Sequence, residues 1–287
     1  MAAARRFGPL GACPARRTID RVSFAFLKGH GTHNDFVVLP DLDGTVHGEL
    51  SADLVRALCD RRGGVGADGV LRVLGSSERD GWFMDYRNAD GSISEMCGNG
   101  VRVFARYLQT AGLVDASRTL AVNTRDGAKQ VVYCTDGEIS VDMGTPILGS
   151  TTAVSSAGVE YEAQSVDLGN PHAVVVLDSL RSLGDLRDAP GLSTDDFPNG
   201  SNVEFVEVRG ERDLAMRVFE RGVGETASCG TGACAVAAAV ATREAAEPPT
   251  TYTVAVPGGR LQVTLETGGA IHLKGPAVLV AEGTWLR

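Results

Sequence analysis

Two cysteines occupy matching positions in two similar stretches of the sequence. Cys97 lies in Met-Cys-Gly-Asn-Gly (96–100) and Cys229 lies in Ser-Cys-Gly-Thr-Gly (228–232). The residues beyond each segment keep the apolar spacing of a buried helix, so each thiol should stand at a helix start. The unpaired N–H groups and the dipole of a helix start can bind a carboxylate and lower the pKa of a nearby thiol. The pattern therefore predicts two reactive thiols.

A buried, unreactive cysteine is the commoner role of any single thiol, but the duplication favours a chemical role here. Thiols at symmetry-related positions can face each other across one cleft. Two opposed acid/base groups are what an inversion of configuration requires, because one group removes a proton from carbon and the other delivers a proton to the opposite face. Nothing in the sequence indicates pyridoxal phosphate or a metal site, so we expect this chemistry to need no cofactor.

The duplication extends beyond the two cysteines. Cys97 and Cys229 are 132 residues apart, and the apolar positions of the two following helices keep this offset. The same offset, or one close to it, relates three further pairs, which are Met84 and Met216, Asn88 and Glu220, and Asn34 and Asn170. The chain is thus predicted to contain two copies of one unit of about 120 to 130 residues.

Strands dominate the predicted elements. Short runs of β-type composition between turn residues predict strands over 22–27, 34–39, 70–74, 82–87, 130–135, 138–143, 173–177, 203–208, 214–219, 251–256, 260–266 and 278–281. Ser51 predicts an N-cap for a short helix over 52–59. The stretch 233–241 is apolar nearly all round, which indicates burial on every side. Each unit should therefore wrap its strands around a central helix.

The composition is that of a folded globular protein. The chain has 287 residues, of which 43% are hydrophobic and 22% charged. Its net charge of -9 has the wrong sign for binding nucleic acid, and no apolar run reaches the ~18 residues of a membrane helix. The six cysteines lack C-x-x-C pairs, which favours reduced thiols in the cytoplasm. We expect no nucleic acid or membrane partner, and a disordered tail over residues 1–21.

Seven segments together resemble the diaminopimelate epimerase family, from about residue 22 to the end of the chain. They are 31–36, 61–69, 88–91, 96–100, 169–172, 220–226 and 228–232. One segment alone would be weak, but seven in the right order are specific. The resemblance implies an α+β fold of two pseudo-symmetric halves, each a curved, mostly antiparallel sheet around a central helix. The expected halves are residues 22–144 plus 276–287 and residues 145–275.

The resemblance also implies an activity and a set of site residues. It implies a cofactor-independent, cytoplasmic, homodimeric epimerase that interconverts LL- and meso-2,6-diaminopimelate for lysine and peptidoglycan biosynthesis. Cys97 and Cys229 would be the two acid/base groups, and His172 and Glu220 would assist catalysis. The implied substrate contacts are Asn34, Asn88, Gly98, Asn99, Asn170, Asn202, Glu220, Arg221, Gly230 and Thr231.

Three other functions are compatible with two thiols. A racemase for a compact substrate such as proline would not need Arg221 and the several asparagines, which suit a second amino-acid head group. A thiol hydrolase or redox protein would use Cys97 and His172 but would leave the second thiol unexplained. A non-catalytic amino-acid-binding protein is the third alternative. Exchange of solvent deuterium into the α-carbon of diaminopimelate, compared with proline, separates these functions.

Overall fold

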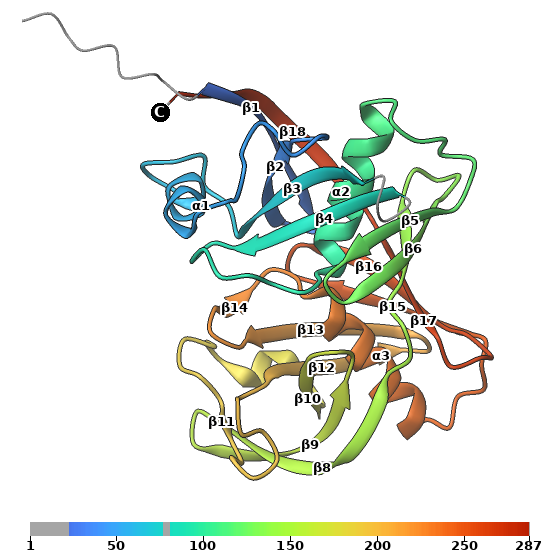
Figure 1. Ribbon diagram of the computed structural model, residues 1–287. Helices are drawn as coiled ribbons and strands as arrows, with labels where there is room; N and C mark the ends of the chain where they lie inside the picture. Colours follow the sequence, from blue (N-terminus) through green and yellow to red (C-terminus); the bar gives the residue numbers. More distant parts are fainter. Residues whose placement is uncertain (1–22, 77–80, 287) are drawn as a thin grey trace, which may run out of the picture.

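A computed structural model describes residues 23–76 and 81–286 of the chain. The predicted tail over residues 1–21 lies outside this described part, and so does Val22, the first residue of a predicted strand. The predicted helices are confirmed as α1 (Ala52–Cys59), α2 (Gly98–Thr110) and α3 (Gly230–Arg243). Apart from a short 3-10 helix, η1 (Leu180–Leu183), the other elements of the described part are strands. The predicted α+β class is therefore confirmed (Figure 1).

The strands divide between two halves, which lie one above the other in Figure 1. The upper half contains β1 (Ser23–Gly31), β2 (Asn34–Pro40), β3 (Gly69–Ser76), β4 (Gly81–Asn88), β5 (Leu120–Thr124), β6 (Gly127–Tyr133), β7 (Ile139–Asp142) and β18 (Val278–Leu286). The other half contains β8 (Ile147–Ser156), β9 (Val159–Asp167), β10 (Pro171–Leu177), β11 (Gly191–Leu192), β12 (Asn202–Gly210), β13 (Asp213–Glu220), β14 (Gly224–Thr226), β15 (Thr250–Val256), β16 (Gly259–Leu265) and β17 (Ile271–Gly275).

Both halves repeat one order of strand pairing. In the first half, β1 to β7 pair in sequence, with β2–β3 and β4–β5 parallel and the other pairs antiparallel. In the second half, β9, β10, β12, β13, β15, β16 and β17 pair in the same way, with β10–β12 and β13–β15 parallel. β7 pairs with β17 and joins the halves, while β18 returns to β1 and β8 pairs with β9. The predicted repeat is therefore present in the topology.

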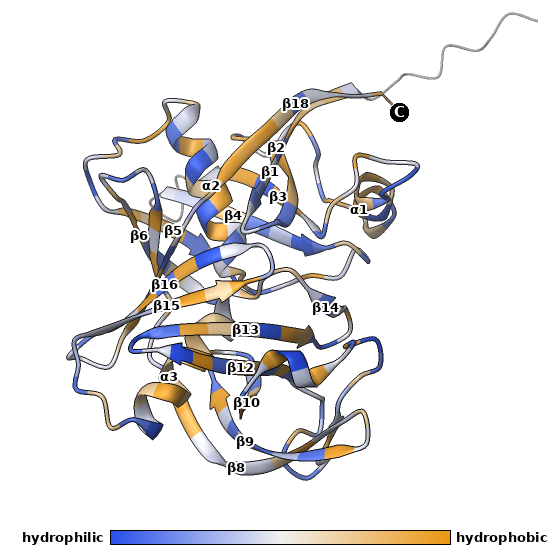
Figure 2. Ribbon diagram, turned by 180° about the vertical axis from the view of Figure 1, so that it is seen from behind, coloured by the Kyte–Doolittle hydropathy of each residue, from blue (hydrophilic) through white to orange (hydrophobic). Residues whose placement is uncertain are grey.

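Each half packs around its own helix. α2 contacts β1, β2, β3, β4, β7 and β18, and α3 contacts β9, β10, β12, β13, β15, β16 and β17. Every residue from 233 to 241 in α3 is at most 5% exposed, as its apolar composition predicts, and Figure 2 shows the apolar colouring of this helix. A helix that is closely packed on every side cannot shift without disturbing its sheet. The two helices therefore hold their first residues in fixed positions.

The sequence pattern misses several strands, among them β8 and β9. β8 is rich in Gly, Ser and Thr, and β9 carries Glu160, Glu162 and Gln164 among its apolar residues. These strands pair with each other, and β9 also pairs with β10. Strand preference depends on such neighbours more than on composition, so these two strands depend on the sheet that they extend.

Gly258 provides a close contact between the two halves. It lies in the turn between β15 and β16, and its N–H donates a hydrogen bond to the Ala227 carbonyl oxygen. A Cβ atom at Gly258 would lie 1.8 Å from the carbonyl oxygen of Thr32, in the turn between β1 and β2. Backbone must move to admit a side chain here, because the atom in the way is a main-chain carbonyl.

We expect Gly258→Ala to lower the free energy of unfolding by about 1–3 kcal/mol, the usual cost of overpacking. Urea unfolding followed by circular dichroism measures this loss. Gly210→Ala is the matched control, because a Cβ atom there meets nothing within 4 Å. Equal stability of the two variants would show that the turns do not hold the halves together.

Candidate active site

The two predicted helix starts are present, with a cysteine as the N-cap of each. The Cys97 sulfur accepts a hydrogen bond from the Gly100 N–H, and the Cys229 sulfur accepts one from the Gly232 N–H, both at 3.4 Å. The first residue of each helix is a glycine, and a Cβ atom on Gly98 or on Gly230 would lie 3.0 Å from the same Leu273 side chain. The glycines thus allow the two helix starts to approach the same part of the core.

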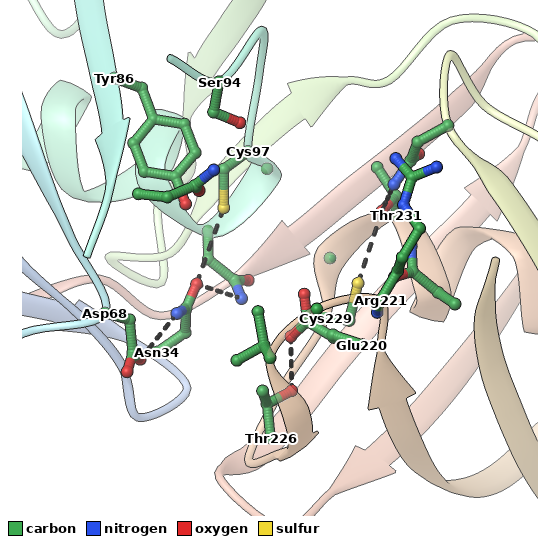
Figure 3. Close-up of a pocket in the computed structure, with 18 of the residues that line it drawn as sticks. Asn34, Asp68, Tyr86, Ser94, Cys97, Glu220, Arg221, Thr226, Cys229 and Thr231 are labelled. Carbon is green, nitrogen blue, oxygen red and sulfur yellow. Dashed lines mark hydrogen bonds between the residues drawn. The ribbon is translucent and has the colours of Figure 1, made fainter. Parts of the chain in front are cut away.

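One cavity of about 550 Å³ lies between the halves, and both thiols line it (Figure 3). All the residues implied as substrate contacts line it too, namely Asn34, Asn88, Gly98, Asn99, Asn170, Asn202, Glu220, Arg221, Gly230 and Thr231. His172 is 0% exposed and lies behind this lining. The structure therefore brings all the predicted site residues to one cavity except His172, which is connected to the cavity by its hydrogen bond to Asn170.

On the first side of the cavity, Cys97 faces an amide oxygen. Its thiol donates to Asn34 Oδ1 at 3.6 Å. Asn34 Nδ2 donates to Asp68 Oδ2 at 2.9 Å, and this carboxylate fixes the direction of the amide. Asn99 Nδ2 donates to Asn34 Oδ1 at 3.2 Å and to the Ser228 carbonyl oxygen at 3.1 Å. Asn99 therefore connects the Cys97 side to the segment that precedes Cys229.

On the second side, Cys229 faces a hydroxyl group. Thr231 Oγ1 lies 3.4 Å from the Cys229 sulfur. Asn170 Nδ2 donates to Thr231 Oγ1 at 3.3 Å, and Asn170 Oδ1 lies 3.0 Å from His172 Nε2. Asn170 is the repeat counterpart of Asn34, but its amide is held by a histidine in place of a carboxylate. The two thiols therefore have different neighbours despite the common fold.

The prediction of lowered thiol pKa values is wrong. Burial raises the pKa of Cys97 to about 11 and that of Cys229 well above its usual range. The negative charge of Glu220 raises both further, whereas the N–H groups of Gly100 and Gly232 lower them only in part. Loss of water outweighs the helix start because a desolvated thiolate is costly. With nothing bound, both groups are thiols at neutral pH.

Glu220 contributes a carboxyl group with a raised pKa to this cavity. It is the last residue of β13, as its repeat counterpart Asn88 is of β4. Burial raises its pKa to about 7, and the charges of Glu204 and Asp68 act in the same direction, while a hydrogen bond from the Thr226 hydroxyl opposes them. This carboxyl group can therefore change its charge near neutral pH.

The raised pKa of Glu220 predicts a pH-dependent stability. The unfolded group titrates near 4.5 and the folded group near 7, so its stabilising effect is complete below 4.5 and is lost as the pH rises to 7. The shift corresponds to about 3 kcal/mol. Urea unfolding measures this effect. As the pH rises from 4.5 to 8, we expect the free energy of unfolding of Glu220→Gln to increase by about 3 kcal/mol relative to that of the wild type. Parallel pH profiles for the two proteins would contradict this account.

The cavity also has residues that sequence reasoning did not single out. Asp68, Thr226 and Ser228 lie within the segments that carry the family resemblance, but no role was expected for them. Tyr86 and Ser94 also line the cavity, and only the assembled fold identifies them. At the rim, Arg221 is exposed, and its Nη1 donates to the Asn199 carbonyl oxygen at 3.2 Å.

Within residues 23–76 and 81–286, no helix combines the length and apolar character needed to cross a bilayer. The same residues contain no cluster of three or more His, Cys, Asp or Glu side chains that could hold a metal ion.

The structure is a duplicated α+β fold in which one thiol from each half lines a single cavity. Two solved structures show the same fold. A phenazine biosynthesis protein of the PhzF family from Bacillus anthracis matches with a TM-score of 0.71 and 20% identity, over 92% of this chain and 99% of that one. A hydroxyproline epimerase from Agrobacterium vitis matches with a TM-score of 0.66 and 15% identity, over 92% of each chain. Residues 26–149 and 164–280 match the diaminopimelate epimerase family. The diaminopimelate epimerase of Streptomyces coelicolor is 51% identical over 275 residues, which cover 90% of this chain and 94% of that protein. The chain belongs to the diaminopimelate epimerase family.

Proposed function

We propose that this epimerase interconverts LL- and meso-2,6-diaminopimelate, with Cys97 and Cys229 as the two acid/base groups. The observation that carries the proposal is that one thiol from each repeat lines the same cavity. In either direction, one cysteine takes the α-proton as a thiolate and the other delivers a proton as a thiol to the opposite face. The product would supply lysine and peptidoglycan biosynthesis.

Substrate binding explains how a thiolate forms in so dry a site. Both thiols have raised pKa values in the absence of substrate. An α-ammonium group in the cavity would bring a positive charge close to them, and an opposite charge within ~4–6 Å favours the ionised form. One of the two thiols would then pass its proton to the Glu220 carboxylate, and the resulting thiolate would be a strong base with little water around it. Deprotonation is thus coupled to the arrival of the correct substrate.

The two helix starts supply donors for the reacting carboxylate. The first turns of α2 and α3 begin at Gly98 and Gly230, and both glycines line the cavity. N–H groups of a first turn have no partner within the helix, so they can hold the α-carboxylate and stabilise the charge that develops on it. Asn202 and Arg221 also line the cavity, and they would bind the second head group, which does not react.

Glu220 and His172 would assist in different ways. Glu220 lines the cavity and can accept or release a proton near neutral pH, which suits contact with a substrate ammonium group. His172 is fully buried and would act through Asn170. The test is exchange of solvent deuterium into the α-carbon of diaminopimelate followed by NMR. Exchange into diaminopimelate with none into proline supports the proposal, and the reverse would overturn it.

We further propose that the enzyme acts in the cytoplasm as a homodimer, with halves at residues 22–144 plus 276–287 and residues 145–275. The cytoplasmic proposal rests on cysteines that are free in the described part of the chain, and the dimer rests on the family resemblance. Sedimentation velocity measures the dimer directly.

A further inference from the structure

A buried polar pair lies behind Cys229, out of contact with the cavity. His172 on β10 and Glu204 on β12 are both 0% exposed, and His172 Nδ1 lies 2.7 Å from Glu204 Oε1. Glu204 Oε2 has no hydrogen-bond partner among the described residues. Glu204 was not predicted as a site residue, and the mechanism proposed above does not use it.

The first half fills the matching space with apolar side chains. The parallel pair β2–β3 aligns Phe36 with Gly69, and the equivalent pair β10–β12 aligns His172 with Asn202. Two residues further along β3 and β12 stand Leu71 and Glu204. Phe36 and Leu71 thus correspond to His172 and Glu204.

The third residue of each helix confirms this correspondence. A Cβ atom on Gly100 of α2 would lie 3.3 Å from Leu71 and 3.7 Å from Phe36, and one on Gly232 of α3 would lie 2.6 Å from Glu204 Oε1. Apolar residues therefore satisfy packing at this position in the same fold. A buried polar pair is often no more stable than apolar residues of similar volume, so packing alone does not account for His172 and Glu204.

A chain of hydrogen bonds through Asn170 and Thr231 links this pair to Cys229, and the donor of each bond can be assigned. Asn170 Oδ1 can only accept, so His172 Nε2 must carry a hydrogen. Asn170 Nδ2 then donates to Thr231 Oγ1, which leaves the Thr231 hydroxyl hydrogen free to point at the Cys229 sulfur. A single proton lies between His172 Nδ1 and Glu204 Oε1, whichever atom holds it.

We infer that Glu204 is a positioning residue for the epimerase reaction. Together with His172 it fixes the amide of Asn170, and the amide in turn directs the Thr231 hydroxyl as a donor to Cys229. A donor stabilises the thiolate form of a cysteine, whereas the Asn34 oxygen that faces Cys97 stabilises the thiol form. The pair would therefore favour the thiolate at Cys229 alone. This inference rests on the proposed role of Cys229 as an acid/base group.

The titratable groups around Cys229 come from several elements. They are His172 on β10, Glu204 on β12, Glu220 on β13, Tyr86 on β4 and Cys97 at the start of α2. The negative charge of Glu204 by itself would oppose a thiolate at Cys229. The charge of Glu204 therefore disfavours the Cys229 thiolate, whereas the hydroxyl donor that Glu204 helps to direct favours it. Because the two effects have opposite signs, an experiment can separate them.

The test replaces the pair by its first-half counterpart, His172→Phe with Glu204→Leu, in a Cys97→Ser background. The rate of alkylation of Cys229 by iodoacetamide is measured against pH without substrate, by mass spectrometry of the Cys229 peptide. We expect the profile to move to higher pH and the rate at pH 8 to fall about tenfold or more, the effect of losing a hydrogen bond to a charged sulfur. Thr231→Val should give the same loss, and combining the changes should add nothing further.

Two controls make the result specific. In a Cys229→Ser background, Cys97 should be alkylated at the same rate whether His172 and Glu204 are present or are replaced by phenylalanine and leucine. Glu204→Gln should keep most of the Cys229 reactivity, because its amide can donate to His172 Nδ1 and leave Nε2 protonated. An unchanged or faster rate at Cys229, or an equal loss at both thiols, would overturn the inference. Because no substrate is present, this failure would be distinct from a failure of the proposed reaction.

Discussion

Alanine in place of Cys97 or of Cys229 is expected to reduce epimerisation by at least about 10³-fold, within the range that acid/base groups contribute. In the proposed mechanism each variant loses the acid/base group for one face of the reacting carbon, so the remaining thiol would not complete an inversion. Turnover of LL-diaminopimelate to the meso form, measured by chiral chromatography, provides the rate. Serine variants at the same positions should retain at most trace exchange or elimination with activated analogues.

Cys234→Ala is the matched control for these variants. Cys234 is a fully buried thiol of the same helix α3, but it packs in the core away from the cavity lining. We expect it to keep the wild-type turnover. By family resemblance, Cys97 should act as the base toward the L centre and Cys229 toward the D centre. Near-wild-type turnover by either alanine variant would exclude the two-base mechanism.

Lysine should be a substrate about 10⁴-fold poorer than diaminopimelate in kcat/KM. It lacks the distal carboxylate, and a site built to bind a polar group rejects an analogue without it because the site's own polar groups remain unpaired. Proline should be rejected for the same reason. Deuterium exchange into each amino acid provides the comparison.

Arg221→Ala should lower kcat/KM for diaminopimelate and reduce the discrimination against lysine. Arg187→Ala is the control, because Arg187 is exposed on the surface and does not line the cavity. Efficient racemisation of lysine or proline by the wild type would favour a racemase of broad specificity.

Much of the site could be predicted from the sequence because its signals are local. The cysteine N-caps of α2 and α3 follow from glycines and apolar spacing within one segment of chain. The common cavity follows from the repeat, since equivalent segments occupy equivalent places in a pseudo-symmetric fold. Strands such as β8 carry no comparable local signal, because they form by pairing with neighbours that come later in the chain.

By itself, the sequence determined the α+β class, the duplication, the two helix starts and, through the family resemblance, the predicted substrate contacts, whereas only the assembled fold identified Tyr86 and Ser94 in the cavity lining. Only the tertiary structure decided the ionisation of the thiols, because the depth of burial that raises the pKa of Cys97 depends on packing from both halves. It also decided the surroundings of Cys229. His172 and Glu204 are 32 residues apart in the chain and meet because β10 and β12 are parallel neighbours. Local spacing contains no information about that register, which arises only when the strands assemble around α3.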